Sequence, residues 1–251
     1  EVSVYGEGIY VGYRYYDKKE IPVRFAFGHG LSYTTFVYTN LRTSSEHFGD
    51  NDTVEVYVDV TNTGKMKGKA VVQLYISDHT GTANRPVKEL KGFEKVELEP
   101  GETKTVSMRI NARSLSYYHV GLGDWYAKSG NYLLMIGSSS DRIEVQKEIQ
   151  FTTQKLLPFT VVPSTTLGEL LADPRTAPVI EGLTSSLGQE RHEVAESAKE
   201  DGYLSESDAK ANEAMKFGMP LKSLVSFRVL SLDQMEGMIA ILNETIAKSK
   251  I

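Results

Sequence analysis

The chain contains no cysteine among its 251 residues and only one tryptophan. Without cysteine there is no disulfide framework, so stability has to come from hydrophobic cores. A chain of this length can bury one or two ordinary cores without a disulfide or a metal to hold them. The absence of cysteine also suits a reducing compartment, which favours a cytoplasmic location.

Two further features are missing: a long apolar run and an excess of basic residues. No apolar run reaches the roughly 18 residues of a membrane span, and no basic segment followed by an apolar one marks a signal peptide at the start. The 28 basic and 33 acidic residues give a net charge of −5, which argues against a nucleic-acid partner. We therefore expect neither a membrane nor a nucleic acid as a partner.

From about Tyr38 to Thr153 apolar and polar residues alternate with a period of two, which predicts β-strands. The clearest strands are expected at residues 54–61, 71–77, 90–98, 103–110, 132–136 and 143–151. Roughly seven short strands with turns about every 8–12 residues predict a mainly β fold, a sandwich of immunoglobulin-like architecture. Because no cysteine pair is present, the fibronectin type III-like variant fits better than a true immunoglobulin domain.

Helices are expected after the β-rich region. Residues 154–165 contain Pro158 and Pro163 and are typical of a linker. Residues 166–251 are expected to form a helical C-terminal extension. Thr166 is expected to cap the first helix.

The rest of this extension has one polar stretch and two further predicted helices. The polar segment 188–205 is the best candidate for a mobile loop, and residues 208–217 are expected to be helical. Ser231 should cap a final amphipathic helix. Its apolar stripe is Leu232, Met235, Met238, Ile239, Leu242 and Ile246, which we interpret as a packing face.

The first 38 residues differ from the rest, because aromatic side chains are interrupted by glycines. Residues 2–16 predict extended segments with turns rather than a long helix. A segment this apolar needs partners to pack against, and the few residues before it in the chain do not supply them. We therefore expect the chain to begin in the middle of a domain, with residues 1–35 weakly protected from hydrogen exchange.

Several motifs now carry a family resemblance. Residues 5–17 (YGEGIYVGYRYYD) and 25–34 (FAFGHGLSYT) resemble the end of the C-terminal α/β sandwich domain of family-3 glycoside hydrolases, which are β-glucosidases, β-xylosidases and relatives. The β-rich part resembles the fibronectin type III-like domain that follows in many of them. Its matching blocks are VTNTG at 60–64, VQLY at 72–75, PVKELKGF at 86–93, GET at 101–103, Trp125, GNY at 130–132 and IGSS at 136–139.

The resemblance divides the chain into four parts. Residues 1–37 are the end of the α/β sandwich domain, residues 38–153 the fibronectin type III-like domain, and residues 154–165 the linker to the extension at 166–251. That extension, with TLGEL at 166–170 and MPL at 219–221, looks like one found on some bacterial members.

The resemblance implies a parent enzyme that removes terminal non-reducing β-D-glucosyl residues with retention, using two carboxyl groups. In the family the nucleophilic aspartate belongs to a barrel domain and the acid/base glutamate to the α/β domain, and neither motif is present here. We therefore assign no catalytic residue, no cofactor and no metal. The implied partners are a carbohydrate substrate, reached through the parent enzyme, and the barrel and α/β domains; a homo-oligomer is also compatible. The alternative is a stand-alone, non-catalytic fibronectin-like binding or interaction module.

Polar residues of the first motif have structural interpretations beside functional ones. Glu7 and Asp17 could form a carboxylate pair near aromatic side chains, but acceptance of backbone hydrogen bonds and a turn explain them better. Arg14 could stack on its tyrosine neighbours or pair with a carboxylate; we favour a role in holding domains together.

The segment 117–126 is the most aromatic loop of the predicted sandwich. It supplies the only candidate sugar-binding residues, Tyr118 and Trp125, which could stack on a substrate at the edge of the cleft. The competing interpretation, which we favour, places Trp125 in the sandwich core, because buried aromatics dominate such cores. The histidines, at positions 29, 47, 79, 119 and 192, are too scattered in the sequence to predict a zinc site.

Overall fold

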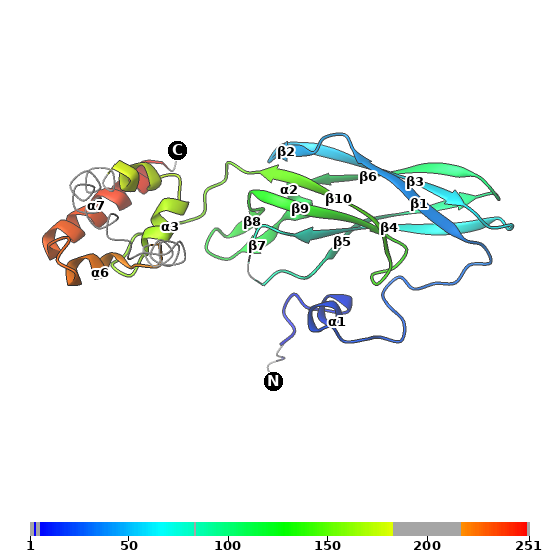
Figure 1. The fold of residues 1–251 in the computed structure, drawn as a ribbon, viewed down its shortest axis with the longest axis horizontal. Helices are drawn as coiled ribbons and strands as arrows, with labels where there is room; N and C mark the ends of the chain where they lie inside the picture. Colours follow the sequence, from blue (N-terminus) through cyan, green and yellow to red (C-terminus); the bar gives the residue numbers. More distant parts are fainter. Residues whose placement is uncertain (1–2, 4–5, 83, 183–216, 250–251) are drawn as a thin grey trace, which may run out of the picture. The chain divides into compact units, whose positions relative to one another are not determined.

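A computed structural model describes residues 3, 6–82, 84–182 and 217–249 and divides the chain into two compact units (Figure 1). The first unit is Glu1–Leu157 and the second is Pro158–Ile251, so the boundary falls inside the segment predicted as a linker. The predicted mobile segment 188–205 and almost all of the predicted helix 208–217 lie outside the described residues.

The first unit is a sandwich of two β-sheets (Figure 1), which confirms the predicted fibronectin type III-like fold class. The three-stranded sheet has the order β1 (Phe36–Thr43), β3 (Thr53–Asn62), β6 (Thr103–Asn111). The five-stranded sheet has the order β2 (His47–Gly49), β10 (Ile143–Thr152), β9 (Gly130–Gly137), β4 (Gly68–Asp78), β5 (Glu89–Leu98). Neighbouring strands are antiparallel except β2 and β10, which are parallel.

Alternating burial shows why these residues form strands. In β3 every second side chain from Val54 to Val60 is buried, and the residues between them are not. These valines face β-branched and aromatic side chains of the opposite sheet, such as Ile149 and Phe151. The six strands expected from the alternation are all present, whereas β1 and the short strands β2, β7 (Tyr117–His119) and β8 (Asp124–Tyr126) were not predicted individually.

Strand β4 is different because it is buried on both faces. Val72, Leu74 and Ile76 point into the sandwich core. The residues between them, Gln73, Tyr75 and Ser77, are also buried, although they face away from that core. A strand covered on both sides has a nearly continuous apolar sequence, as VVQLYIS does.

Two short helices occur among the described residues of the first unit. Helix α1 (Tyr13–Lys19) begins inside the stretch for which extended structure was expected, so that expectation is wrong after Gly12. Gly12 adopts a φ of +61°, a turn that glycine allows at low cost, and Glu20 ends the helix in the left-handed conformation. Helix α2 (Ala112–Leu115) follows β6 and is closed by a capping box between Asn111 and Ser114.

The described part of the second unit has two short helices and one of 17 residues around a small apolar core. Its described helices are α3 (Leu167–Ala172), α6 (Leu221–Ser226) and α7 (Leu232–Lys248). Thr166 and Ser231 form capping boxes with Glu169 and Gln234, which confirms both predicted caps. Most of the predicted stripe of α7 packs into this core, but Leu232 at its start is 55% exposed. Among the described residues no helix is both long and apolar enough to cross a membrane.

The neighbouring residues Val71 and Val72 offer a matched test of the sandwich core. Val72→Ala removes two buried methyl groups and should lower the free energy of unfolding by about 2 kcal/mol. Val71→Ala, at a position that is 39% exposed, should change it by less than about 0.5 kcal/mol. Urea unfolding followed by the fluorescence of Trp125 measures this unit alone, because Trp125 is the only tryptophan. Equal effects of the two substitutions would contradict the assignment of the core face of β4.

Candidate functional site

The N-terminal segment, residues 6–35, covers the outer face of β4. The ring of Tyr13 packs edge-on against Tyr75 at 5.9 Å and stacks on Phe27 at 5.1 Å. The hydroxyl oxygen of Tyr13 accepts a hydrogen bond of 2.7 Å from the backbone N–H of Leu90 in β5. Burial raises the pKa of the Tyr75 phenol, so its hydroxyl stays protonated and donates to Gln73.

Gly28 lies directly against Gln73 of β4. Its φ is +81°, and a Cβ atom at this position would meet the Nε2 of Gln73 at 2.2 Å. The Gln73 amide cannot move away easily, since it donates to the carbonyl of Ser138 at 2.9 Å and is itself buried. Both the backbone conformation and the close approach therefore require glycine.

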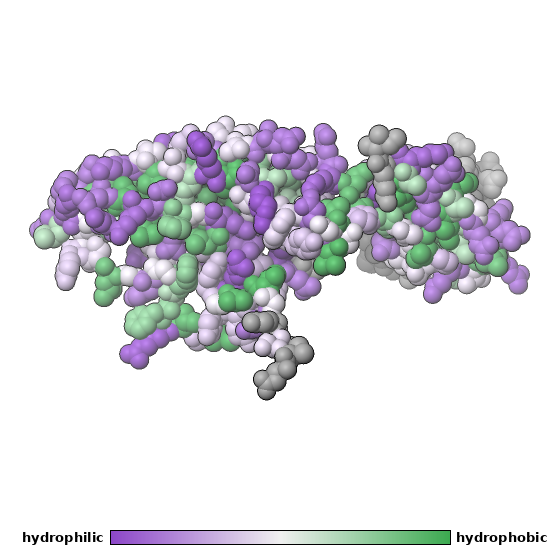
Figure 2. All heavy atoms as spheres, turned by 180° about the vertical axis from the view of Figure 1, so that it is seen from behind, coloured by the Kyte–Doolittle hydropathy of each residue, from purple (hydrophilic) through white to green (hydrophobic). Residues whose placement is uncertain are grey.

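The expectation that this segment lacks packing partners is wrong for its inner side and right for its outer side. No described residue between 6 and 35 is fully buried. Figure 2 shows apolar side chains at the surface of this segment, below the sandwich. The exposed large apolar residues, called here the N-terminal apolar surface, are Ile9, Val11, Tyr15, Tyr16, Ile21, Val23, Phe25, Phe27, Leu31 and Tyr33.

Ion pairs also attach α1 to the sheet. Asp17 pairs with Lys88 at 2.7 Å, and Arg14 pairs with Glu89 at 3.2 Å. The Arg14 contact suits the interpretation that this residue holds parts of the structure together. Asp17 lies inside α1 rather than in the expected turn, and its role is the ion pair with Lys88. The Glu7 side chain is exposed, while its backbone carbonyl accepts a hydrogen bond from the N–H of Tyr10 at 3.0 Å.

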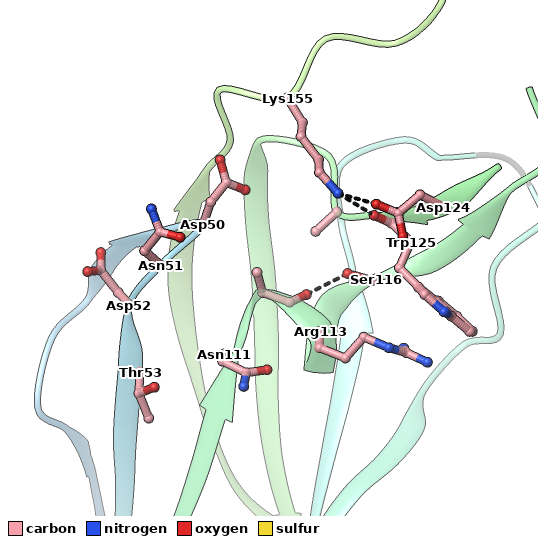
Figure 3. A pocket seen from close by; sticks show the side chains of 12 residues that line it. Asp50, Asn51, Asp52, Thr53, Asn111, Arg113, Ser116, Asp124, Trp125 and Lys155 are labelled. Atoms are coloured by element: carbon pink, nitrogen blue, oxygen red, sulfur yellow. Dashed lines mark hydrogen bonds and ion pairs between the residues drawn. The ribbon is translucent and has the colours of Figure 1, made fainter. Parts of the chain in front are cut away.

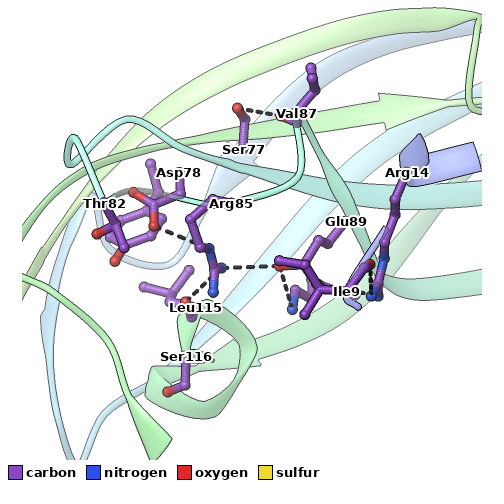
Figure 4. A network of polar contacts seen from close by, with 12 residues as sticks. Ile9, Arg14, Ser77, Asp78, Thr82, Arg85, Val87, Glu89, Leu115 and Ser116 are labelled. Carbon is purple, nitrogen blue, oxygen red and sulfur yellow. Dashed lines mark hydrogen bonds and ion pairs between the residues drawn. The ribbon is translucent and has the colours of Figure 1, made fainter. Parts of the chain in front are cut away.

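Glu89 is the centre of a larger network of charges (Figure 4). Besides Arg14, its carboxylate contacts Arg85 at 3.0 Å and Lys91 at 3.5 Å. Arg85 also lies 3.3 Å from the buried Asp78 and donates to the carbonyl of Leu115 at 3.1 Å. The Arg85 guanidinium is therefore held on three sides in a nearly buried position.

Lys91 enters this network through a β-bulge. In the β4–β5 register Leu74 lies opposite Gly92 and Tyr75 opposite Leu90, so Lys91 is the extra residue. Bulges change the direction of a side chain in this way. Burial, opposed by the nearby Glu89, lowers the pKa of the Lys91 ammonium.

The aromatic loop forms a two-stranded ribbon, β7–β8, in which Tyr118 lies opposite Trp125. Trp125 is 40% exposed, so the interpretation of this residue as a core side chain is wrong. The core position of the ribbon is taken by Tyr126, the next residue, because side chains alternate between the faces of a strand. Trp125 is instead covered by the Arg113 guanidinium, 3.2 Å from the ring centroid, and by the edge of Tyr118 at 5.7 Å.

Trp125, Arg113 and Ser116 line two neighbouring cavities. The first, of about 470 Å³, is shown in Figure 3. Its acidic side chains already have partners: Asp124 pairs with Lys155 at 2.6 Å, and Asp50 accepts from the Thr153 hydroxyl at 2.7 Å.

The second, which we call the basic cavity, has a volume of about 630 Å³. Its chemically distinctive lining residues are Arg14, Arg85, Glu89, Lys91, Arg113, Tyr117, Tyr118 and Trp125. Tyr118 and Trp125 were predicted from the sequence as candidate sugar-binding residues, whereas Arg85, Lys91 and Arg113 were not. An arginine before a proline and a lysine within a strand carry no distinguishing sequence pattern.

The described histidines have local contacts. The Nδ1 of His119 accepts a hydrogen bond from the N–H of Leu122 at 3.1 Å, and the ring of His29 lies 5.2 Å from that of Phe25. No group of three or more His, Asp and Glu side chains suited to a metal ion occurs within the described ranges. His192 lies outside them.

Comparisons with known proteins match this architecture. Residues 70–140 match the model of the fibronectin type III-like domain. The chain is 41% identical over 187 residues to the thermostable β-glucosidase B of Acetivibrio thermocellus, covering 73% of this chain and 25% of that protein. It is 50% identical over 149 residues to a β-glucosidase of Kluyveromyces marxianus, covering 59% of this chain and 17% of that one.

A solved structure gives the same result. The GH3 β-glucosidase of Bifidobacterium adolescentis superposes with a TM-score of 0.64 at 34% identity, over 70% of this chain and 26% of the other. The resemblance to family-3 β-glucosidases is thus confirmed, and the match is to their C-terminal fibronectin type III-like region. The chain spans about a quarter or less of the length of these relatives.

Gly28→Ala should loosen the N-terminal segment from β4. Alanine strains a backbone with positive φ by about 1–2 kcal/mol and also collides with Gln73. Because a helix of seven residues is not stable alone, amide protection in α1 should fall about tenfold or more in hydrogen exchange. Gly30→Ala is the control, since its Cβ would meet nothing within 4 Å. Unchanged protection in Gly28→Ala would contradict the contact.

Lys91→Met should stabilise the fold near neutral pH. Burial lowers the Lys91 pKa, so the folded state holds this proton less tightly than the unfolded chain does. The wild-type contribution of Lys91 to stability should therefore become more favourable as pH rises from the folded pKa toward the ordinary value of 10.5. The urea midpoints of wild type and Lys91→Met, measured over a range of pH, should therefore approach each other as the pH rises. If Lys91→Met is less stable than wild type at neutral pH, the prediction is wrong, and the Glu89 carboxylate needs the Lys91 charge as a partner.

Proposed function

We propose that this chain is the C-terminal supporting part of an enzyme that hydrolyses terminal non-reducing β-D-glucosyl residues with retention of configuration. The observation that carries the proposal is the identity of 41–50% to β-glucosidases of a bacterium and a yeast over this part of their length. It is supported by the motifs at 5–17 and 25–34, which lie before the sandwich in the expected order.

The N-terminal segment joins the sandwich to the rest of that enzyme. Its inner side is fixed to β4 and β5 by Tyr13, Gly28 and the ion pairs of α1. Its outer side presents the N-terminal apolar surface, whose residues Leu31 and Tyr33 are 95% and 98% exposed. Contiguous exposed apolar residues mark an interaction site, and each 100 Å² buried there would contribute about 2.5 kcal/mol. The proposed partner of this surface is the rest of the α/β domain, of which this segment forms the end.

We further propose that the chain alone is inactive. A retaining glycosidase needs two carboxyl groups about 5–5.5 Å apart, one acting as nucleophile and the other as acid and base. Here Asp17, Asp78 and Glu89 are each held in ion pairs with lysine or arginine. These roles are structural, which supports the placement of the catalytic carboxylates elsewhere in the enzyme.

A second function, as a carbohydrate-binding module, is favoured by one specific observation. Trp125 and Tyr118 are partly exposed beside a cavity rather than buried in the core. Exposed aromatic rings next to polar groups are a common way to bind a sugar.

A chimaera tests the proposed function. In it, residues of this chain replace the matching 187-residue region of the A. thermocellus β-glucosidase. We expect the chimaera to hydrolyse an aryl β-glucoside, whereas the 251-residue chain alone should not. An inactive but folded chimaera would contradict the supporting role, and hydrolysis by the isolated chain would contradict its predicted inactivity.

Leu31→Asp tests the apolar surface within the same chimaera. Burial of a new carboxylate should lower the stability of the chimaera by at least about 2 kcal/mol, seen as a lower melting temperature and lost activity. In the isolated chain the same substitution should change the free energy of unfolding by less than about 0.5 kcal/mol, because Leu31 is exposed. Val120→Asp, at an 87% exposed position in the β7–β8 loop, is the matched control. If Leu31→Asp and Val120→Asp behave alike in the chimaera, the surface is not an interface.

A further inference from the structure

We propose that the basic cavity binds an acidic monosaccharide, with the sugar carboxylate held by Lys91 and Arg113 and the sugar ring lying against Tyr118 and Trp125. The inference concerns the chain by itself and does not depend on the proposed β-glucosidase activity.

The first argument is the charge of the cavity. Arg14, Arg85, Lys91 and Arg113 all line it, against the single lining carboxylate of Glu89. Asp78 lies behind Arg85 and neutralises one more charge. The cations still outnumber these carboxylates, so the cavity attracts an anion.

The second argument is the supply of free hydrogen-bond donors. Among the contacts of the described residues, the nearly buried Lys91 ammonium has only the shared carboxylate of Glu89, at 3.5 Å. An ammonium carries three N–H donors, so this one can bind further acceptors. The Arg113 guanidinium stacks on Trp125 and has no carboxylate partner within the described part of the chain. A carboxylate placed between Lys91 and Arg113 would satisfy both.

The third argument is the aromatic wall. Tyr118 is 52% exposed and Trp125 is 40% exposed, and both line the cavity. Tyrosine and tryptophan present an apolar face to the C–H groups of a sugar ring and a polar group at the rim. The volume of about 630 Å³ lies within the usual range for small-molecule sites, which is about 300–1,000 Å³.

Together these features select among ligands. A neutral sugar would leave the excess positive charge unmatched, and an inorganic anion would leave the aromatic wall unused. A sugar that carries a carboxylate, as a hexuronic acid does, satisfies both parts of the site. The β-bulge that directs Lys91 into the network supports this selection, because it places a charge where burial makes that charge costly.

A fluorescence titration of the 251-residue chain tests the proposal directly, because Trp125 is its only tryptophan. Sodium glucuronate should produce a saturable change in Trp125 emission. Glucose and sodium acetate, which supply the ring and the carboxylate separately, should each bind at least about tenfold more weakly. The indole N–H resonance of Trp125 gives a second readout by NMR, so a silent fluorescence signal does not leave the question open.

Variants locate the binding. Lys91→Met keeps the apolar stem and removes the charge, and it should weaken glucuronate binding about tenfold. Arg113→Met should also weaken glucuronate binding about tenfold. Binding to this variant is followed by NMR, because the substitution itself changes the environment of Trp125. Lys104→Met removes an exposed lysine that is paired with Glu102 outside the cavity, and should leave binding unchanged. A melting curve for each variant confirms that it is folded.

Three results would overturn the proposal. The first is no saturable response to glucuronate in either readout. The second is equal affinity for acetate and glucuronate, which would show a bare anion site, or equal affinity for glucose, which would show a neutral sugar site. The third is unchanged glucuronate affinity in folded Lys91→Met.

Discussion

The rest of the first unit depends on the burial of β4 from both sides. One face of this strand builds the sandwich core with Val72 and Leu74. The other face carries Gln73 and Tyr75, and it is covered by Gly28 and Tyr13 of a segment more than forty residues away in sequence. Polar groups can be buried there only with partners. The Tyr75 hydroxyl therefore donates to the Gln73 amide oxygen, and the Gln73 amide nitrogen donates to the carbonyl of Ser138. Position 28 must then be glycine, because a Cβ atom there would collide with the Gln73 amide.

This docking also determines where the charged groups meet. Once α1 lies on the sheet, Arg14 reaches Glu89, and the same carboxylate serves Arg85 and Lys91. Nearly buried charges of this kind contribute little net stability, and Lys91 is held at a cost that lowers its pKa. The proposed binding site therefore exists because the N-terminal segment and a β-bulge bring cations to the rim of the aromatic ribbon β7–β8. Groups with perturbed pKa values of this kind cluster at functional sites.

Several elements could be predicted from sequence because their signals are local. The alternation of Val54, Val56 and Val58 gives β3 a core face without further information. The caps Thr166 and Ser231 are visible for the same reason, since a capping box needs only residues three apart. Helix α1 was missed because its formation depends on docking through Tyr13 and Asp17, and a seven-residue helix has little intrinsic stability. Trp125 was misplaced because alternation in a three-residue strand does not reveal which face is inward.

The sequence by itself determined the fold class, the positions of six strands and the resemblance to family-3 β-glucosidases, because these follow from periodicity and from motifs in order along the chain. Only the tertiary structure decided which residues of the N-terminal segment are inside and which form its apolar outer surface. It also decided that Lys91, Arg113 and Trp125 line one cavity. These residues come from separate strands and a helix, and nothing in their local sequence fixes the distance between them. Contacts of that kind arise only when sheet register, a bulge and a docked helix act together.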